Sequence, residues 1–170
     1  MPPTTKDISS RVSFASLTPN NVGTVKKLNS VLFPVKYSDK FYAEILQPDV
    51  EDFCRLVYYN DIPVGIICCR IELKGKASDL YLLTMGVLAP YRHLGVGSYM
   101  LQQISDSASS HTKSPVQRIY LHVQISNDGA KSFYEKHGFV EVGVDDSYYK
   151  KIKPSAAWIL EKAISRTKEV

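Results

Sequence analysis

The chain has 170 residues, of which 44% are hydrophobic and 22% are charged. This length predicts one globular domain with an ordinary apolar core, because domains of about 100 to 150 residues are the commonest. The formal net charge of +4 is spread along the chain, without the dense basic blocks of a nucleic-acid groove. No apolar run is long enough to span a bilayer. We therefore expect neither sequence-specific nucleic-acid binding nor membrane association.

Three cysteines, Cys54, Cys68 and Cys69, lie in apolar, strand-like segments and have neither a zinc spacing nor that of a disulfide framework. We therefore expect no bound metal and a reducing compartment, the cytoplasm, with the nucleus left open as a second location. Residues 1–10 are rich in Pro, Ser and Thr and predict a flexible tail. Residues 11–170 then form a single domain.

The N-terminal half predicts a meander of strands with two helices. VSFASL predicts an edge strand, and a helix with Thr18 as its N-cap follows, because apolar residues recur at helical spacing from Val22 until Pro34. SDKFYAEILQ predicts a short helix. The strands FCRLVYYN and IPVGIICCRIEL are joined by the tight-turn pair Asn60-Asp61. DLYLLTMGVL predicts a third strand after them.

The C-terminal half alternates between helical and strand patterns. A helix is expected after Gly97, with Met100, Leu101 and Ile104 as its buried stripe, before the polar segment SDSASSHTKS. RIYLHVQI predicts a strand, NDGAKSFYEKHG a helix, FVEVGV a strand and residues 156–164 a last amphipathic helix. A strand–helix–strand order predicts a parallel crossover beside the antiparallel meander. The fold class is therefore α/β, with a mixed sheet flanked by helices.

The most specific motif is APYRHLGVGSYML, which lies between a predicted strand and a predicted helix. Its Gly95 and Gly97 let the backbone approach a ligand, and the first-turn N–H groups of a helix favour a phosphate there. It is neither a GxGxxG fingerprint nor a P-loop, because residue 100 is Met and no Gly-Lys-Ser/Thr follows. By itself the GxG fits a plain tight turn equally well.

The arrangement R-x-x-G-x-G after a strand, with IYLHVQISN and FYEKHGF further along, resembles the GNAT superfamily of acetyl-CoA-dependent N-acetyltransferases. LNSVLFPVKYSDKFY, YYNDIPVG and LYLLTMGVLAPYRHLGVGS narrow the resemblance to the protein N-terminal acetyltransferases of the NatE class. The resemblance implies a GNAT fold with a splayed parallel strand pair. It also implies acetyl-CoA as co-substrate and transfer to the free α-amine of protein N-termini, with Met followed by a hydrophobic or related residue. The partner that it implies is the large auxiliary subunit of the NatA complex at the ribosome.

The resemblance also assigns roles residue by residue. It makes Tyr81 and His122 the pair that holds a water and deprotonates the substrate amine. It places acetyl-CoA contacts at Met85, Gly86, Val87, Arg92, His93, Leu94, Gly95, Val96, Gly97, Ser98, Asn127 and Tyr134. It places the peptide groove at Phe33, Pro34, Val35, Tyr37, Leu83, Tyr148, Tyr149 and Lys150.

These residue types suit the chemistry. An α-amino group has a pKa of about 7.7 to 8.0 and is mostly ammonium at cellular pH, whereas a histidine with a pKa near 6.5 is mostly neutral at pH 7 and can accept a proton. Tyr81 and His122 would project into one cleft if their strands were parallel neighbours. A strand histidine without this context is more often a hydrogen-bonded structural residue, and that interpretation of His122 stays open.

Two other functions remain. The chain could be a GNAT enzyme that acts on lysine side chains or small amines, or a NatA-associated binding subunit with little catalysis. The intact series Arg92, Gly95 and Gly97 favours catalysis over the binding subunit.

Overall fold

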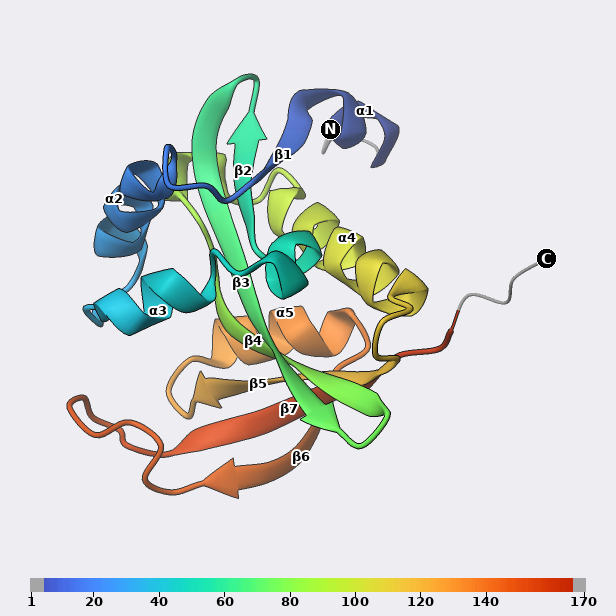
Figure 1. Ribbon diagram of the computed structural model, residues 1–170. Coiled ribbons are helices and arrows are strands. Elements are labelled where there is room, and N and C mark those ends of the chain that lie inside the picture. Colours follow the sequence, from blue (N-terminus) through green and yellow to red (C-terminus); the bar gives the residue numbers. More distant parts are fainter. Residues whose placement is uncertain (1–4, 167–170) are drawn as a thin grey trace. The chain divides into compact units, whose positions relative to one another are not determined.

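The computed structural model describes residues 5–166 (Figure 1). Within these residues, seven strands form one mixed sheet in the order β1-β2-β3-β4-β5-β7-β6. Their bounds are Val12–Ser16 (β1), Arg55–Tyr59 (β2), Ile62–Lys74 (β3), Ala77–Val87 (β4), Val116–Gln124 (β5), Val140–Asp145 (β6) and Ala157–Ala163 (β7). Strands β4 and β5 pair in parallel, whereas the β1–β2, β2–β3, β5–β7 and β6–β7 pairs are antiparallel. The predicted mixed sheet is confirmed, and the splay of its parallel pair stays a prediction.

Helices lie in the connections from β1 to β2, from β4 to β5 and from β5 to β6. Their bounds are Thr5–Arg11 (α1), Val22–Leu32 (α2), Asp39–Glu44 (α3), Val96–Ser110 (α4) and Asp128–Lys136 (α5), with 3₁₀ turns at Pro48–Phe53 and Ala89–Tyr91. In the part of the chain that the structure describes, none of the helices has the length and apolar character needed to cross a bilayer.

The chain divides into two compact units, and the expectation of a single domain stays a prediction. The first unit comprises the residues up to Ile71 and Leu82–Ser107. Its helices α2 and α3 pack on β2 and β3 through an apolar cluster that includes Val25, Leu28, Phe41, Ile45, Leu56, Ile66 and Cys68. At Gly65 of β3, a Cβ atom would lie 2.9 Å from the backbone oxygen of Gly86 on β4. Only glycine therefore permits this close approach without a shift of backbone.

The second unit comprises Glu72–Tyr81 and the residues from Ala108 onward. Strand β7 lies between β5 and β6 and pairs with both. Helix α5 contacts this sheet: Nζ of its Lys131 lies 4.3 Å from the ring centroid of Trp158 on β7. The ring of Tyr134, near the end of α5, lies 5.5 Å from that of Phe139. These contacts hold α5 against β7 and against Phe139, just after the helix.

The predicted C-terminal helix is wrong, because residues 157–163 form strand β7. The sequence AWILEKA contains good helix formers, which favoured a helix. However, the segment pairs with β5 on one side and β6 on the other, for example Leu160 with Leu121 and Glu141. Two hydrogen-bonded neighbours outweigh an intrinsic preference of a few tenths of a kcal/mol per residue.

Three N-terminal details also differ from expectation. Residues 5–10 of the predicted tail lie in α1, where Ile8 is only 3% exposed; residues 1–4 lie outside the described residues. The N-cap of α2 is Asn21 and not Thr18, because Thr18 belongs to the preceding turn and donates its N–H to Asn21 Oδ1. Val31, one of the apolar residues that recur at helical spacing, is 66% exposed.

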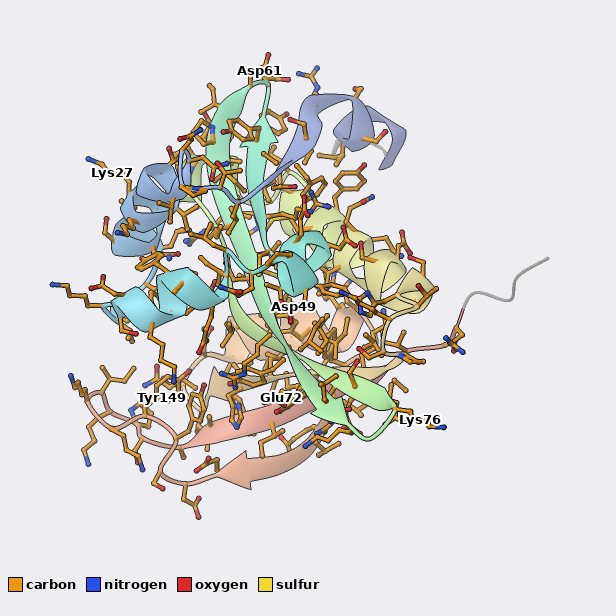
Figure 2. The ribbon with its side chains drawn as sticks, in the orientation of Figure 1. Lys27, Asp49, Asp61, Glu72, Lys76 and Tyr149 are labelled. Carbon is orange, nitrogen blue, oxygen red and sulfur yellow. The ribbon has the colours of Figure 1, made fainter. Side chains whose placement is uncertain are left out.

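The predicted β2–β3 hairpin is confirmed. Asn60 and Asp61 have φ values of 46° and 66°, the left-handed values that a two-residue type I′ turn requires. Figure 2 shows Asp61 at this turn and Lys76 at the turn between β3 and β4. Helix α4 extends further than predicted, to Ser110, because Ala108 continues its buried stripe.

Candidate active site

Tyr81 on β4 and His122 on β5 lie side by side in the second unit. The hydroxyl of Tyr81 is 2.8 Å from Nδ1 of His122. The parallel register pairs Tyr81 with Tyr120, and His122 follows two residues later on the same face of β5. Tyr81 is 6% exposed, so its hydroxyl depends on protein partners. The structure brings the two residues together as the sequence predicted.

Tyr148, in the loop between β6 and β7, completes a cluster of three side chains. Its hydroxyl lies 2.6 Å from that of Tyr81. Its ring stacks on the imidazole of His122, with centroids 4.0 Å apart and planes 9° from parallel. The resemblance had placed Tyr148 only in the peptide groove, so its contact with both residues of the pair was missed.

Burial lowers the pKa of His122 below its ordinary value of 6.5, and the Asp145 carboxylate partly opposes this shift. Removing water disfavours the charged imidazolium more than the neutral ring. At pH 7 the imidazole is therefore neutral and available as a base.

The three side chains can form a continuous hydrogen-bond chain. A neutral His122 with its proton on Nε2 accepts the Tyr81 hydroxyl at Nδ1, and the Tyr81 oxygen can in turn accept the hydroxyl of Tyr148. When another group gives a proton to the Tyr81 oxygen, the Tyr81 hydroxyl can release its own proton to Nδ1 of His122. The arrangement is therefore suited to general-base catalysis.

The glycine-containing loop of the first unit lies between β4 and α4. The side chain of Arg92 donates from Nε to the backbone oxygen of Val87 at 2.9 Å, which ties the loop to the end of β4. Gly95 has a φ of 88°, a left-handed value that favours glycine, and its carbonyl accepts the N–H of Tyr99 at 3.0 Å. Helix α4 thus begins directly after Gly95, at Val96. The predicted residues His93, Leu94, Gly97 and Ser98 complete the loop and the first turn.

This loop has the properties of an anion site. The first-turn N–H groups of a 15-residue helix carry partial positive charge and lack intrahelical acceptors. The predicted residues Met85, Gly86 and Val87 form the last part of β4, and Arg92 holds them beside the loop. A Cβ atom at Gly86 would lie 3.0 Å from Cζ of Phe33, so glycine also sets the distance between β4 and the end of α2.

The other two predicted acetyl-CoA residues lie in the second unit. Asn127 is the N-cap of α5, and its side-chain oxygen accepts the N–H of Ala130 at 3.2 Å. Tyr134 is buried and its ring contacts those of Phe133 and Phe139. Each therefore has a structural role in α5, whatever ligand it contacts.

Four of the predicted peptide-groove residues line one cavity of the first unit. The cavity has a volume of about 430 Å³ and lies between the end of α2 and the start of α3. Its lining comprises Phe33, Pro34, Val35 and Tyr37 together with Lys26, Asn29, Ser30, Lys36, Asp39 and Tyr42. The polar members of this lining were not predicted. The cavity therefore combines an apolar wall with charged and amide groups.

The remaining predicted groove residues are more scattered. Leu83 packs against the apolar cluster of the first unit. Tyr149 follows Tyr148, and their rings lie 4.8 Å apart. Burial raises the pKa of the Tyr149 phenol, and its neighbour Tyr148 adds to this, whereas a backbone hydrogen bond at Gln124 opposes it. Lys150 is exposed at the start of the lysine-containing tip of the loop.

Sequence reasoning missed the surroundings of Tyr81. The ring of Tyr120 lies 4.8 Å from that of Tyr81 and under the guanidinium of Arg118. The only signal was that residues 118, 120 and 122 share one face of a predicted strand. Among residues 5–166, no three or more His, Cys, Asp or Glu residues are grouped so that they could hold a metal ion.

Comparison with known proteins gives a family match and several close relatives. The acetyltransferase (GNAT) family matches residues 23–139. The chain is 44% identical to "Probable N-acetyltransferase san" of Drosophila melanogaster, over 93% of this chain and 84% of that protein. It is 42% identical to N-alpha-acetyltransferase 50 of Danio rerio, over 91% of this chain and 89% of that protein. Its fold is similar to that of Arabidopsis thaliana Naa50 in complex with the bisubstrate analogue CoA-Ac-MVNAL, with a TM-score of 0.82. The two sequences are 42% identical, and the match covers 89% of this chain and 98% of that chain.

Proposed function

Because the chain belongs to the acetyltransferase (GNAT) family, we propose that it transfers the acetyl group of acetyl-CoA to the free α-amine of protein N-termini that begin with methionine. The observation that carries the proposal is the hydrogen bond between Tyr81 and a neutral His122. The analogue held by the Arabidopsis relative joins CoA to an acetylated peptide whose first residue is methionine, which supports the substrate class.

The amine must lose a proton before it can attack. We assign this step to Tyr81 and His122: the ammonium gives its proton to the Tyr81 oxygen, directly or through one water, while the Tyr81 hydroxyl passes its own proton to Nδ1 of His122. The amine nitrogen then forms a bond to the thioester carbon, and the carbon–sulfur bond breaks. The nitrogen loses its second proton as the CoA thiolate leaves and becomes a thiol. No acyl-enzyme is needed, and the three cysteines are buried.

Acetyl-CoA is a good fit to the loop that follows β4. Its pyrophosphate carries negative charge, and the start of α4 supplies N–H groups next to two glycines that leave room for a ligand. We therefore assign pyrophosphate binding to residues 92–98 and contacts along the pantetheine arm to residues 85–87. Asn127 and Tyr134 are proposed as further contacts.

Peptide recognition is assigned to two segments. The apolar wall formed by Phe33, Pro34 and Val35 is suited to an unbranched apolar side chain such as methionine. Leu83 is proposed as a further contact beside this wall, and Tyr37, Tyr148, Tyr149 and Lys150 as contacts with the peptide backbone.

The test is acetylation of two sets of matched peptides, Met-Leu and Met-Lys, each with a free or a blocked α-amine. Acetyl transfer to the free N-terminus and none to the blocked peptides is the expected result. Transfer to the lysine side chain of the blocked peptide would instead support the lysine-directed alternative. A protein that binds no acetyl-CoA would support the binding-subunit alternative.

We further propose that the protein works in the cytoplasm on nascent chains, together with the large auxiliary subunit of the NatA complex at the ribosome. The support is the resemblance of its sequence to NatE-class enzymes. Co-purification of the auxiliary subunit and ribosomes with the tagged protein, lost after high-salt washing, is the measurement that tests this association.

A further inference from the structure

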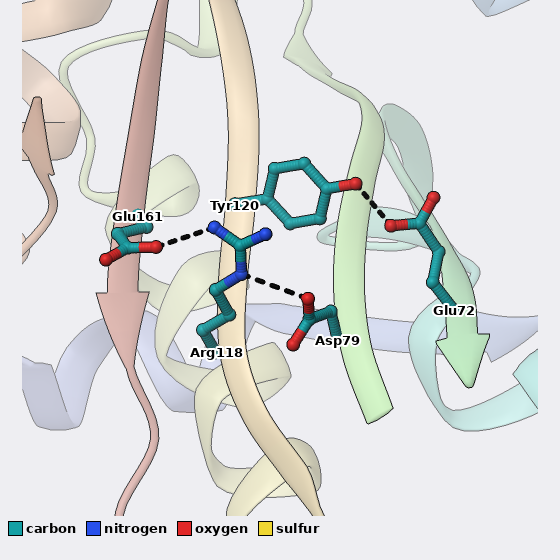
Figure 3. A network of polar contacts seen from close by, with 5 residues as sticks. All are labelled: Glu72, Asp79, Arg118, Tyr120 and Glu161. Atoms are coloured by element: carbon teal, nitrogen blue, oxygen red, sulfur yellow. Dashed lines mark hydrogen bonds and ion pairs between the residues drawn. The ribbon is translucent and has the colours of Figure 1, made fainter. Parts of the chain in front are cut away.

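A cluster of charged side chains surrounds Arg118 (Figure 3), and two of its strands, β4 and β5, also carry Tyr81 and His122. Arg118 on β5 donates from Nε to Asp79 on β4 at 3.1 Å and from Nη1 to Glu161 on β7 at 2.6 Å. Asp79 is buried, so its charge requires this partner. The two carboxylates thus hold the guanidinium in one position across three neighbouring strands.

This cluster fixes the side chain of Tyr120. The hydroxyl of Tyr120 donates to the carboxylate of Glu72 on β3, and the guanidinium carbon of Arg118 lies 4.2 Å from its ring centroid. Figure 3 shows the ring between these two groups. A tyrosine side chain has two soft torsions, and a contact on the ring face together with a bond at the hydroxyl constrains both.

Tyr120 in turn is in contact with Tyr81. The two residues are register partners on β5 and β4, and their rings lie 4.8 Å apart at 55°. The ring of Tyr81 also lies 5.6 Å from the imidazole of His122. Since Tyr120 and His122 are two residues apart on one face of β5, Tyr81 is held between them. A rotation of Tyr81 away from His122 requires Tyr120 to yield.

We propose that Tyr120 is a positioning residue, which Glu72 and Arg118 hold in place so that the Tyr81 hydroxyl stays at Nδ1 of His122. The inference rests on the proposed function and deepens it. Tyr120 touches no reacting atom, and its effect acts through Tyr81 alone. The alternative is that Tyr120 only covers the sheet, in which case its loss changes stability and leaves catalysis unaffected.

The test compares Tyr120→Leu and Tyr120→Phe with Tyr58→Leu, a matched loss of a strand tyrosine in the first unit. Tyr120→Leu removes the ring, and we expect kcat to fall about 10- to 100-fold, because a misplacement of about 1 Å in a catalytic group has effects of that size. The Kd for acetyl-CoA should stay unchanged. Tyr120→Phe keeps the ring and loses the hydroxyl that donates to Glu72, so a decrease of a few-fold is expected. Tyr58→Leu should retain the wild-type kcat.

A second readout does not depend on activity. NMR titration gives the pKa of His122, whose neighbouring titratable groups are Tyr81, Tyr148 and Asp145. In Tyr120→Leu this pKa should rise toward 6.5. Loss of the Tyr81 donor destabilises the neutral imidazole, and entry of water removes the burial effect. Should the leucine variant fail to fold, Tyr120→Phe and Glu72→Gln carry the same two measurements with smaller expected changes.

The outcomes are distinct. Wild-type kcat together with an unchanged His122 titration in a folded Tyr120→Leu overturns the positioning role. If Tyr58→Leu lowers kcat as much as Tyr120→Leu does, the effect is general loss of structure, and the positioning role is likewise overturned. If the wild-type protein acetylates no peptide α-amine, the proposed function fails, while the titration still decides whether Tyr120 holds Tyr81 against His122.

Discussion

The ring of Tyr148 lies on the imidazole of His122, with planes 9° from parallel, while its hydroxyl lies 2.6 Å from that of Tyr81. Tyr148 therefore shields the histidine from water and also occupies one hydrogen-bonding position of the tyrosine. It is 37% exposed and belongs to a loop, so it is the member of the cluster that can move with least disturbance. A substrate amine that reaches Tyr81 must take the place of this hydroxyl or approach beside it.

Replacing His122 with alanine should remove the base. We expect kcat to fall by about 10² to 10⁴, the usual contribution of general-base catalysis, with the Kd for acetyl-CoA unchanged. Steady-state kinetics and calorimetric titration measure the two quantities. Equal losses of turnover and of acetyl-CoA binding would make His122 a structural residue, which is the interpretation that its strand position alone allowed.

Two substitutions of Tyr148 separate its ring from its hydroxyl. Tyr148→Ala opens the imidazole to water, so the pKa of His122 should rise toward 6.5. The acidic limb of the pH profile of kcat should then move to higher pH. Tyr148→Phe keeps the stacked ring, and its acidic limb should stay close to that of the wild type. The pH dependence of kcat for both variants is the measurement. An acidic limb in Tyr148→Ala at the wild-type pH would show that stacking does not protect His122.

The pH profile of the wild-type enzyme follows from the direction of the His122 shift. Because burial lowers its pKa, His122 becomes protonated and unable to accept a proton only below pH 6.5. The profile of kcat/KM should therefore rise through a step below pH 6.5 that belongs to His122, because only the neutral imidazole can take the proton of the bound ammonium. His122→Ala should lose this step. A wild-type profile without a step below pH 6.5 would contradict this assignment.

Protonation of His122 also affects stability. Its pKa is lower in the folded protein than in the unfolded chain, so the unfolded chain binds more protons as the pH falls through 6.5. The free energy of unfolding should therefore decrease below pH 6.5, and this decrease should be smaller in His122→Ala. Urea titrations of both proteins between pH 5 and 7 measure the difference.

A methyl group at Gly86 tests the close approach of β4 and the end of α2. In Gly86→Ala the new Cβ atom would lie 3.0 Å from Phe33 Cζ and 3.1 Å from Leu32 Cδ1, so Phe33 must shift. We expect a loss of about 1 to 3 kcal/mol in the free energy of unfolding, as for other overpacked sites, and a higher KM for the peptide. The matched control is Gly23→Ala, where a Cβ atom meets nothing within 4 Å. The explanation fails if both substitutions have the same effect on stability.

Local patterns in the sequence were sufficient for most elements. Alternating apolar residues and the Asn60-Asp61 turn predicted the β2–β3 hairpin, and Asn127 predicted the start of α5. They failed for β7, whose helix-forming residues become a strand because β5 and β6 both pair with it.

The sequence by itself determined which residues are proposed for the chemistry: Arg92, Gly95 and Gly97 at the start of a helix, and a tyrosine and a histidine on two strands of one expected sheet. Only the tertiary structure decided what surrounds that pair. Tyr148 and the residues Glu72, Asp79 and Glu161 are distant from His122 in sequence, and their contacts depend on strand register and loop conformation. These are set by the packing of the whole chain and leave no periodic signal in any one segment.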